Sequence, residues 1–411
     1  MVTGPRSLAW RAFPGESLVR HERQPHPFVM PCLAACDRTR QTGRLCMPRL
    51  VFDAEQLHLT LDDGQTLAQH VLWLQDHDPA RRHANGQRLD SVLDLDWDAA
   101  ISEAALEEGD VLRVTLSNAR EIRYGVDELA ALSTGFPDER SSAHKTLWQG
   151  SEFSVARVEW ADVIAGGEAR RKALAWVRDT GVVCLRGVPV EPGKVLEVIE
   201  QFGYVRETNY GKLFDVRTEV SPSNLAFSNL GLGAHTDNPY RDPAPSIQLL
   251  HCLSNEVEGG QTLLVDGFAA AERLRELAPE SFALLTRTRV PFRFHDADHA
   301  DLRSWVPFIE TDHKGNIRQV RYNNRSIASL PLPLEAQRAF YRAYHDWARV
   351  IGQPEQATRL RLAPGDCLLF DNSRVMHART AFVAGGNRHL QGAYADLDSL
   401  YSTLNLLENA R

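Results

Sequence analysis

Apolar and polar residues alternate in short runs along the segment from Leu50 to about Leu132. An Asp-Asp-Gly turn at residues 62–64 separates two of these runs, and this arrangement is typical of a β-hairpin. Side chains that alternate in this way point to opposite faces of a strand, so one face can pack on a core. We therefore expect a small β-rich domain over residues 49–135.

The rest of the chain alternates between strand-like and helical patterns. The segment Ser133–Phe153 is polar and turn-prone, so we expect a linker there and a second domain over residues 150–411. Apolar residues at helical spacing predict a helix at 166–181, which Gly181 ends. Apolar runs predict strands at 182–188, 245–253, 261–268, 366–371 and 388–396. Further helices are predicted at 269–277, 279–287 and 333–351 and at the C-terminus.

Two of the predicted strands, 245–253 and 261–268, flank an acidic Gly-Gly turn, as the strands of an antiparallel pair do. Antiparallel strands with helices inserted between them are typical of a jelly-roll core supported by helices. The pattern therefore predicts a mainly β fold with helices, in which a jelly-roll domain follows the small β-rich N-terminal domain.

The first 48 residues show neither a helical nor a strand period, and they are rich in Pro, Arg and polar residues. Arginines occur early, but no apolar segment follows them, so the pattern is not that of a secretory signal. We expect residues 1–48 to be a disordered extension, or translated sequence upstream of the true start, since a recognisable domain begins just after Met47.

Composition narrows the class of protein. The chain has 411 residues, of which 43% are hydrophobic and 24% charged, and no apolar run is long enough for a membrane helix. The net charge of -8 argues against an extended nucleic-acid surface, so we expect a small-molecule partner, with no nucleic acid and no membrane. The cysteines form no CxxC pair or regular framework, which favours a reducing cytoplasm; they are Cys32, Cys36, Cys46, Cys184, Cys252 and Cys367.

A candidate metal site lies in the segment GLGAHTDNPYRDP, where His235 and Asp237 are two residues apart and would share one face of an extended backbone. This spacing is common on protein surfaces, but DNSRVMHART supplies His377 just after a predicted strand. Two imidazoles and one carboxylate form the facial triad that leaves positions open on Fe(II). Arg388 follows and could grip the distal carboxylate of a chelating keto acid through two hydrogen bonds, with the Thr262 hydroxyl as a further donor.

From about residue 49 to the C-terminus, several segments occur in the order and spacing of one family: LWLQD, SNLAFSNLGLGAHTDNPYRDP, QLLHCL, EGGQTLLVDGF, RYNNRS, PGDCLLFDNSRVMHAR and NRHLQGAYADLD. The chain thus resembles the γ-butyrobetaine hydroxylase and trimethyllysine hydroxylase family of Fe(II)- and 2-oxoglutarate-dependent oxygenases, within the taurine dioxygenase-like group. The resemblance implies a double-stranded β-helix, iron held by His235, Asp237 and His377, and 2-oxoglutarate held by Arg388 and Thr262. It also implies a homodimer and stimulation by ascorbate.

In members that act on γ-butyrobetaine, an aromatic cage holds the trimethylammonium group. Matching the motifs places Tyr210, Phe214, Phe227 and Tyr394 at the cage positions. Phe214 and Phe227 depart from the Trp and Tyr of the family pattern, but both keep an aromatic face for a cation. Any one of these rings, considered alone, would be assigned to core packing. All four match cage positions of the family, and this agreement favours the cage.

The other end of the substrate would meet Asn224 and Asn323, for which a capping role in a turn is the alternative. Arg325 favours a more strongly anionic head group, so trimethylaminoethylphosphonate is a second candidate substrate. Trimethyllysine or a natural-product amino acid is a third. A protein that keeps the fold but only senses a ligand is the alternative from another functional class, and an intact triad together with Arg388 argues against it.

One feature of the family is missing. Its small N-terminal domain often holds a structural zinc through three cysteines and a later histidine, whereas Asp78, Ala80 and His83 stand at the cysteine positions here. Structural zinc tolerates few departures from thiolate and imidazole ligands, so we expect no zinc. We expect the alternative metal set, His77 with Asp78 and His83, to face solvent. The remaining histidines considered are assigned no chemistry: His251, His295, His313, His345 and His389.

Overall fold

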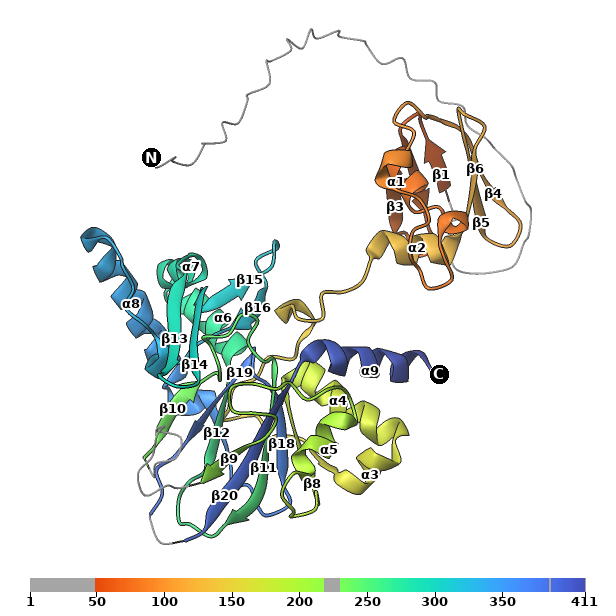
Figure 1. The fold of residues 1–411 in the computed structure, drawn as a ribbon. Coiled ribbons are helices and arrows are strands. Elements are labelled where there is room, and N and C mark those ends of the chain that lie inside the picture. The colour runs from red at the N-terminus through yellow and green to blue at the C-terminus, as the bar shows by residue number, and fades with distance from the viewer. Residues whose placement is uncertain (1–48, 218–229, 384–385, 411) are drawn as a thin grey trace, which may run out of the picture. The chain divides into compact units, whose positions relative to one another are not determined.

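The computed structural model describes residues 49–217, 230–383 and 386–410 (Figure 1). The predicted extension 1–48 and two predicted substrate residues, Asn224 and Phe227, lie outside these ranges. The chain divides into two compact units between Phe136 and Pro137. Within the described ranges, no helix is both long enough and apolar enough to span a bilayer.

In its described residues, the first unit has two three-stranded antiparallel sheets and two α-helices. Its elements are β1 (Arg49–Phe52), β2 (Gln56–Thr60), β3 (Thr66–His70), α1 (Val71–Asp76), β4 (Ile101–Glu107), β5 (Val111–Leu116), β6 (Glu121–Gly125) and α2 (Val126–Thr134). The predicted turn at 62–64 joins β2 to β3, and Gly64 adopts a φ of 87° there, which suits glycine. Alternate residues of β2 and β5 are buried in one hydrophobic core, as the sequence pattern predicts.

The loop at the family's zinc position is held by Asp78, which is 4% exposed. One carboxylate oxygen lies 2.7 Å from an Arg120 guanidinium nitrogen, and the other accepts the backbone N–H of Ala80 at 2.9 Å. The expectation that Asp78 faces solvent is therefore wrong, because its partner Arg120 comes from a distant part of the chain. The described residues contain two groups of side chains close enough to share a metal ion, and neither includes His77, Asp78 or His83.

The second unit is built on two β-sheets that form a jelly roll (Figure 1). Side chains from both sheets pack together in one buried cluster. The larger sheet has the strand order β7 (Arg157–Glu159), β8 (Val182–Arg186), β18 (Cys367–Asp371), β11 (Ile247–Asn255), β20 (Arg388–Ala395), β9 (Phe214–Arg217). The smaller sheet has the order β10 (Leu232–His235), β19 (Val375–Arg379), β12 (Thr262–Asp266), β17 (Ala357–Leu360). The predicted fold class, mainly β with helices around a jelly roll, is confirmed.

The predicted pairing of the strands at 245–253 and 261–268 is wrong. The first forms β11, which pairs with β18 and β20 of the larger sheet. The second forms β12, which pairs with β17 and β19 of the smaller sheet. The Gly-Gly turn between them carries the chain from one sheet to the other, and a local pattern of apolar residues cannot distinguish this crossover from a hairpin.

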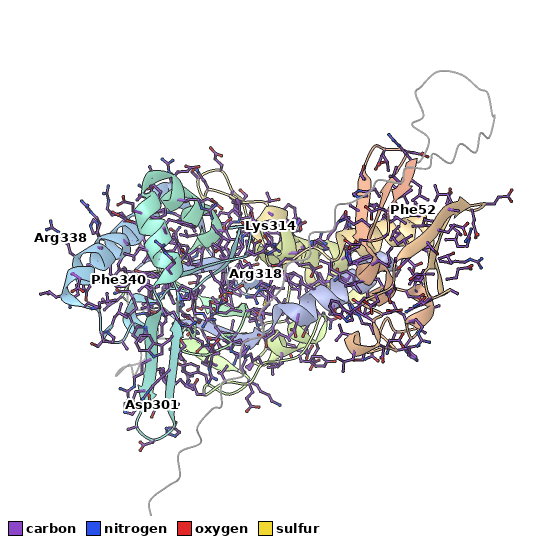
Figure 2. All side chains as sticks on the ribbon, turned by 90° about the horizontal axis from the view of Figure 1, so that it is seen from above. Phe52, Asp301, Lys314, Arg318, Arg338 and Phe340 are labelled. Carbon is purple, nitrogen blue, oxygen red and sulfur yellow. The ribbon has the colours of Figure 1, made fainter. Side chains whose placement is uncertain are left out.

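Helices cover both sides of this core. The larger sheet packs against α3 (Trp160–Ala165), α4 (Gly167–Thr180), α5 (Lys194–Glu200) and α9 (Leu397–Asn409). A second cluster joins the smaller sheet to α6 (Gly267–Leu277), α7 (Pro279–Arg287) and α8 (Leu334–Ile351). Figure 2 shows Arg338 and Phe340 on α8: the first is exposed and the second is buried in that cluster. The predicted helices are confirmed, including the end of α4 at Gly181, whose φ is 83°.

Two hairpins between α7 and α8 were not predicted as elements. They are β13 (Val290–Asp296) with β14 (Ala300–Val306), and β15 (Ile309–Thr311) with β16 (Ile317–Val320). The end of the predicted linker also differs, because residues 137–153 belong to the second unit. Trp148 anchors this segment: it is 6% exposed, and its indole N–H donates to the Thr180 carbonyl at 2.8 Å.

A fully buried ion pair fixes the start of β19. The Arg374 guanidinium contacts the Asp266 carboxylate at 2.8 Å, and both side chains are 0% exposed. Arg374→Met is expected to lower the free energy of unfolding by about 3–5 kcal/mol, because it leaves the Asp266 charge buried without its partner. Urea unfolding followed by tryptophan fluorescence would measure this. Arg338→Met, on the exposed face of α8, is the control and should leave the unfolding curve unchanged; equal curves for the two variants would contradict the prediction.

Candidate active site

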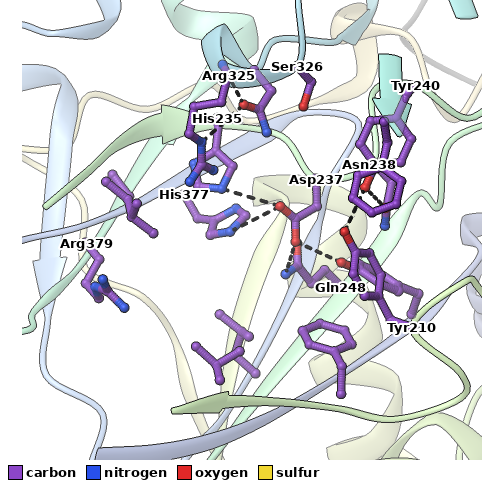
Figure 3. A pocket seen from close by; sticks show the side chains of 18 of the residues that line it. Tyr210, His235, Asp237, Asn238, Tyr240, Gln248, Arg325, Ser326, His377 and Arg379 are labelled. Carbon is purple, nitrogen blue, oxygen red and sulfur yellow. Dashed lines mark hydrogen bonds and ion pairs between the residues drawn. The ribbon is translucent and has the colours of Figure 1, made fainter. Parts of the chain in front are cut away.

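Three potential metal ligands converge where β10 meets β19. His235 is the last residue of β10 and lies directly opposite His377 on β19. Asp237 follows just beyond the strand, and its Oδ1 lies 3.4 Å from Nε2 of His235 and 3.9 Å from Nε2 of His377 (Figure 3). One ligand atom from each side chain lies within 4.8 Å of the other two. The predicted triad is thus brought together in the structure.

The protonation of these groups fits a divalent metal. Nδ1 of His235 lies 2.8 Å from the Gly233 carbonyl, so Nδ1 donates and the lone pair of Nε2 faces Asp237. Burial lowers the pKa of His377 to about 3, so its imidazole is neutral. Burial opposes ionisation of Asp237, but the neighbouring His377 and His235 and the hydroxyl of Tyr394 hold its pKa below the ordinary value. Two imidazoles and one carboxylate are ligand types that suit Fe(II).

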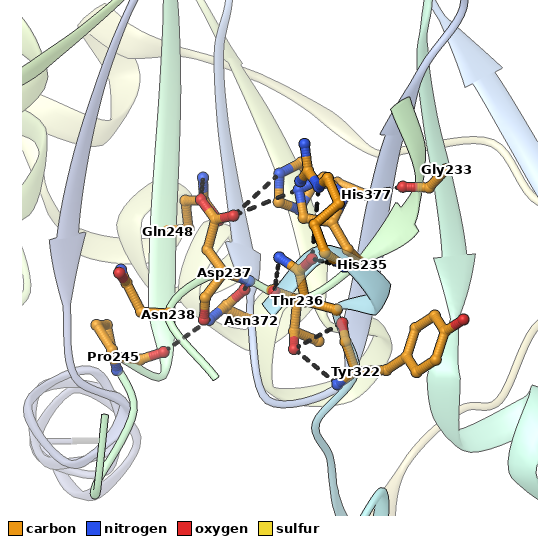
Figure 4. Close-up of polar contacts among 12 residues, drawn as sticks. Gly233, His235, Thr236, Asp237, Asn238, Pro245, Gln248, Tyr322, Asn372 and His377 are labelled. Atoms are coloured by element: carbon orange, nitrogen blue, oxygen red, sulfur yellow. Dashed lines mark hydrogen bonds and ion pairs between the residues drawn. The ribbon is translucent and has the colours of Figure 1, made fainter. Parts of the chain in front are cut away.

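The backbone of Asp237 is clamped by Asn372, which lies in the turn between β18 and β19 (Figure 4). The Asn372 side-chain oxygen accepts the N–H of Asp237 at 2.8 Å, and its NH₂ group donates to the carbonyls of Asp237 at 3.0 Å and Pro245 at 2.9 Å. The turn that leads into the His377 strand therefore also fixes the Asp237 segment. Asn372 lies in the sequence motif FDNSRVMH, but no local pattern indicates its partner.

The three residues line a cavity of about 370 Å³. Eight other residues were predicted for the site. Asn224 and Phe227 lie outside the described ranges, and the other six border this cavity: Tyr210, Phe214, Thr262, Asn323, Arg388 and Tyr394. Several lining residues were not predicted from the sequence, among them Tyr240, Gln248 and Phe294. His295, to which no chemistry was assigned, also borders the cavity, from β13.

One wall of the cavity carries a buried cation. Arg388 is 7% exposed and Thr262 is 6% exposed. In the part of the chain that the structure describes, Arg388 forms no ion pair with a carboxylate and its Nε has no hydrogen-bond partner. Burial lowers its pKa, although an arginine remains charged. Gly260 leaves room for this guanidinium, because a Cβ there would lie 3.3 Å from Arg388 Nε. An anionic ligand would supply the missing partner.

Aromatic rings form another wall. Phe214 stacks on Tyr394 with 5.0 Å between ring centroids, and Tyr210 lies edge-on to Phe294 at 5.8 Å. Tyr240 stacks on Phe294 at 5.1 Å. Phe294 reaches the cavity from the β13–β14 hairpin. The alternating residues of the segment VPFRFHD could have indicated this strand in the sequence. The structure therefore joins three of the four predicted cage residues with two further rings.

The predicted head-group residues differ in their contacts. Asn323 is 6% exposed, and its side-chain oxygen accepts the N–H of Arg325 at 3.1 Å, which caps a short 3-10 helix at Asn324–Ser326. Its NH₂ group lies 3.4 Å from the Thr236 carbonyl. The capping alternative for Asn323 is thus observed. Arg325 lines the cavity while remaining exposed to solvent.

Comparisons with known proteins agree with this architecture. The family model of the taurine catabolism dioxygenase TauD, TfdA family matches residues 143–394. A gamma-butyrobetaine dioxygenase from Pseudomonas sp. strain AK-1 is 34% identical over 365 residues, covering 86% of this chain and 94% of the relative. The human gamma-butyrobetaine dioxygenase is 33% identical over 263 residues, covering 63% and 68%. A trimethyllysine dioxygenase from Meyerozyma guilliermondii is 36% identical over 236 residues, covering 56% and 58%.

Among solved structures, an asparagine oxygenase in complex with Fe(II), hydroxyasparagine and succinate has a TM-score of 0.45 and 19% identity, with 56% of this chain and 80% of that chain covered. The family model and the long alignment with the Pseudomonas relative confirm the resemblance that the sequence motifs indicated. The chain belongs to the taurine catabolism dioxygenase TauD, TfdA family and is a 2-oxoglutarate-dependent dioxygenase whose cofactors are iron and 2-oxoglutarate.

Proposed function

We propose that this enzyme hydroxylates a small quaternary-ammonium substrate, with γ-butyrobetaine or a close analogue as the leading candidate. One observation carries the proposal: the His235, Asp237 and His377 ligand atoms and a group of aromatic rings border the same cavity of about 370 Å³. The relatives named gamma-butyrobetaine dioxygenase and trimethyllysine dioxygenase support the same substrate class.

In this proposal His235, Asp237 and His377 hold the iron, which together with 2-oxoglutarate supplies the oxidising chemistry when bound. Arg388 grips the distal carboxylate of 2-oxoglutarate through paired hydrogen bonds, and the Thr262 hydroxyl adds a donor. The buried Arg388 side chain, whose Nε has no hydrogen-bond partner among the described residues, supports this role.

The aromatic wall would hold the trimethylammonium group. Such a cation cannot donate a conventional hydrogen bond, but it is attracted to the electron-rich ring faces by about 0.5–2 kcal/mol per contact. Tyr210, Phe214 and Tyr394, together with Tyr240 and Phe294, offer such rings in one cavity. Holding the cation at a fixed place determines which C–H bond lies nearest the metal, and this placement is the enzyme's own contribution to selectivity.

Turnover of γ-butyrobetaine can be compared with turnover of an analogue that has the same shape but lacks the positive charge. The purified chain with Fe(II), ascorbate and 2-oxoglutarate is expected to form succinate faster with γ-butyrobetaine than without substrate. In 5,5-dimethylhexanoate a carbon replaces the nitrogen, so shape is kept and charge is lost, and kcat/KM should fall about tenfold or more. Equal kcat/KM for the charged and neutral compounds would rule out a cation-binding cage, and succinate at the substrate-free level with γ-butyrobetaine would exclude it as the substrate.

A second candidate substrate is trimethylaminoethylphosphonate, and Arg325 is the residue that favours it. The guanidinium borders the cavity beside Asn323, whose amide is engaged in capping. A doubly charged phosphonate would gain more from a guanidinium than a carboxylate does. A higher kcat/KM for the phosphonate than for γ-butyrobetaine in the same assay would favour this candidate.

A homodimer, a cytoplasmic location and stimulation by ascorbate remain predictions from the sequence and its family resemblance. Sedimentation of the purified chain would test the first of these, and omission of ascorbate from the turnover assay would test the last.

A further inference from the structure

We propose that Tyr394 and Gln248 are positioning residues that restrict Asp237 to one metal-binding oxygen, and that Tyr394 thereby connects the aromatic wall to the metal site. This inference rests on the proposed iron ligands. It concerns the second oxygen of the Asp237 carboxylate, which does not face the histidines.

The two oxygens of Asp237 have separate sets of partners. Oδ1 faces the Nε2 atoms of His235 and His377. Oδ2 accepts a hydrogen bond of 2.8 Å from the NH₂ group of Gln248 (Figure 3). It accepts a second one, also of 2.8 Å, from the hydroxyl of Tyr394. Both donors would have to be given up before Oδ2 could approach a metal. The contacts therefore favour a carboxylate that binds through Oδ1 alone and leaves the other coordination positions open.

The sheet explains why this pair of donors is rigid. Gln248 lies on β11 and Tyr394 on β20, and the two residues are direct cross-strand partners in the larger sheet. They are 1% and 3% exposed. Adjacent strands at the centre of a hydrogen-bonded sheet hold their side chains at a fixed spacing, so both donors reach the same oxygen without rearrangement.

Tyr394 makes a second contact through its aromatic ring. Its ring stacks on Phe214 at 5.0 Å and borders the cavity. The ring therefore belongs to the wall proposed to hold the substrate cation, while the hydroxyl orients a metal ligand. A substrate that packs on the ring face touches the same side chain that fixes Asp237, so substrate placement and ligand geometry share one residue.

Metal affinity separates these two contributions. Loss of a hydrogen bond to a ligand typically weakens metal binding by about 10–100-fold. Tyr394→Phe removes the hydroxyl and keeps the ring, so the Kd for Co(II), measured without substrate, should rise by about this factor while the KM for γ-butyrobetaine stays unchanged. Tyr394→Leu removes both and should raise both constants. Gln248→Met removes the other donor at similar volume and should also raise the Co(II) Kd.

Tyr401→Phe and Gln391→Met are matched controls. Both positions are buried in the same unit, both lose side-chain hydrogen bonds, and neither borders the cavity. Their Co(II) Kd should equal that of the unaltered chain, which separates a positioning effect from general loss of stability. Circular dichroism would verify that each variant is folded.

The proposal is overturned if folded Tyr394→Phe and Gln248→Met both bind Co(II) as tightly as the unaltered chain. It is also overturned if the two control variants lose as much Co(II) affinity as Tyr394→Phe and Gln248→Met. Because the titration contains no substrate, a wrong substrate assignment leaves its outcome intact. Retention of Co(II) binding by His235→Ala would instead contradict the proposed iron ligands.

Discussion

His235→Ala is expected to abolish succinate formation completely and to remove specific Co(II) binding. The substitution takes away one of three ligand atoms that lie within 4.8 Å of each other, and leaves an imidazole and a carboxylate that cannot form the facial arrangement. The effect should be specific, because the Asn372 clamp on Asp237 and the backbone pairing with β19 do not need the imidazole.

Succinate detected by NMR and Co(II) titration measure the two effects in the same preparation. His345→Ala on the exposed side of α8 is the control and should retain both turnover and metal binding. Retained turnover in His235→Ala would contradict the ligand assignment. A ligand-induced change in the unaltered chain that survives this substitution, with no turnover in either protein, would instead support the sensor alternative.

Arg388→Met is expected to raise the KM for 2-oxoglutarate by roughly 30-fold to more than a thousandfold. Truncating one partner of a buried, hydrogen-bonded charge pair costs about 2–5 kcal/mol, and each 1.4 kcal/mol is a factor of about ten. The KM for the quaternary-ammonium substrate should change little, because the aromatic wall is untouched. Arg388→Lys keeps the charge but not the paired hydrogen bonds. Its KM for 2-oxoglutarate should therefore lie between that of the unaltered enzyme and that of Arg388→Met.

A keto acid without the distal carboxylate gives an independent measurement. The unaltered enzyme should use 2-oxopentanoate much less efficiently than 2-oxoglutarate, because only the latter can pair with Arg388. In Arg388→Met that preference should largely disappear. An unchanged KM for 2-oxoglutarate, or an unchanged preference between the two acids, would assign the cosubstrate to another cation of the cavity.

Site residues that lie close together in the sequence could be predicted for this chain. His235 and Asp237 lie in one motif, which runs from the end of β10 into the residues just beyond it. Arg388 begins a different strand, β20, and was predicted from its separation from His377 along the sequence. Phe294 is different, because it enters the cavity from a hairpin between two helices whose position depends on tertiary packing. No periodicity in the sequence states which wall that hairpin will reach.

Contacts that depend on strand order were beyond the sequence. The crossover from β11 to β12 was predicted as a hairpin, because a hairpin and a crossover between two sheets can have the same turn residues. The same limit applies to Gln248, whose partner Tyr394 lies on a strand that is adjacent only in the folded sheet. Asp78 and Arg120 form another such pair: each is an ordinary charged residue until the fold brings them to 2.7 Å.

The absence of a side chain at Gly392 makes the size of the cavity depend on a residue behind its wall. Gly392 is the cross-strand partner of Phe214, and a Cβ at that position would lie 2.2 Å from Phe214 Cζ. One added methyl group would force the ring to move, although every side chain that borders the cavity kept its identity. Substrate range in enzymes of this architecture can therefore diverge while a comparison restricted to the lining residues finds them identical.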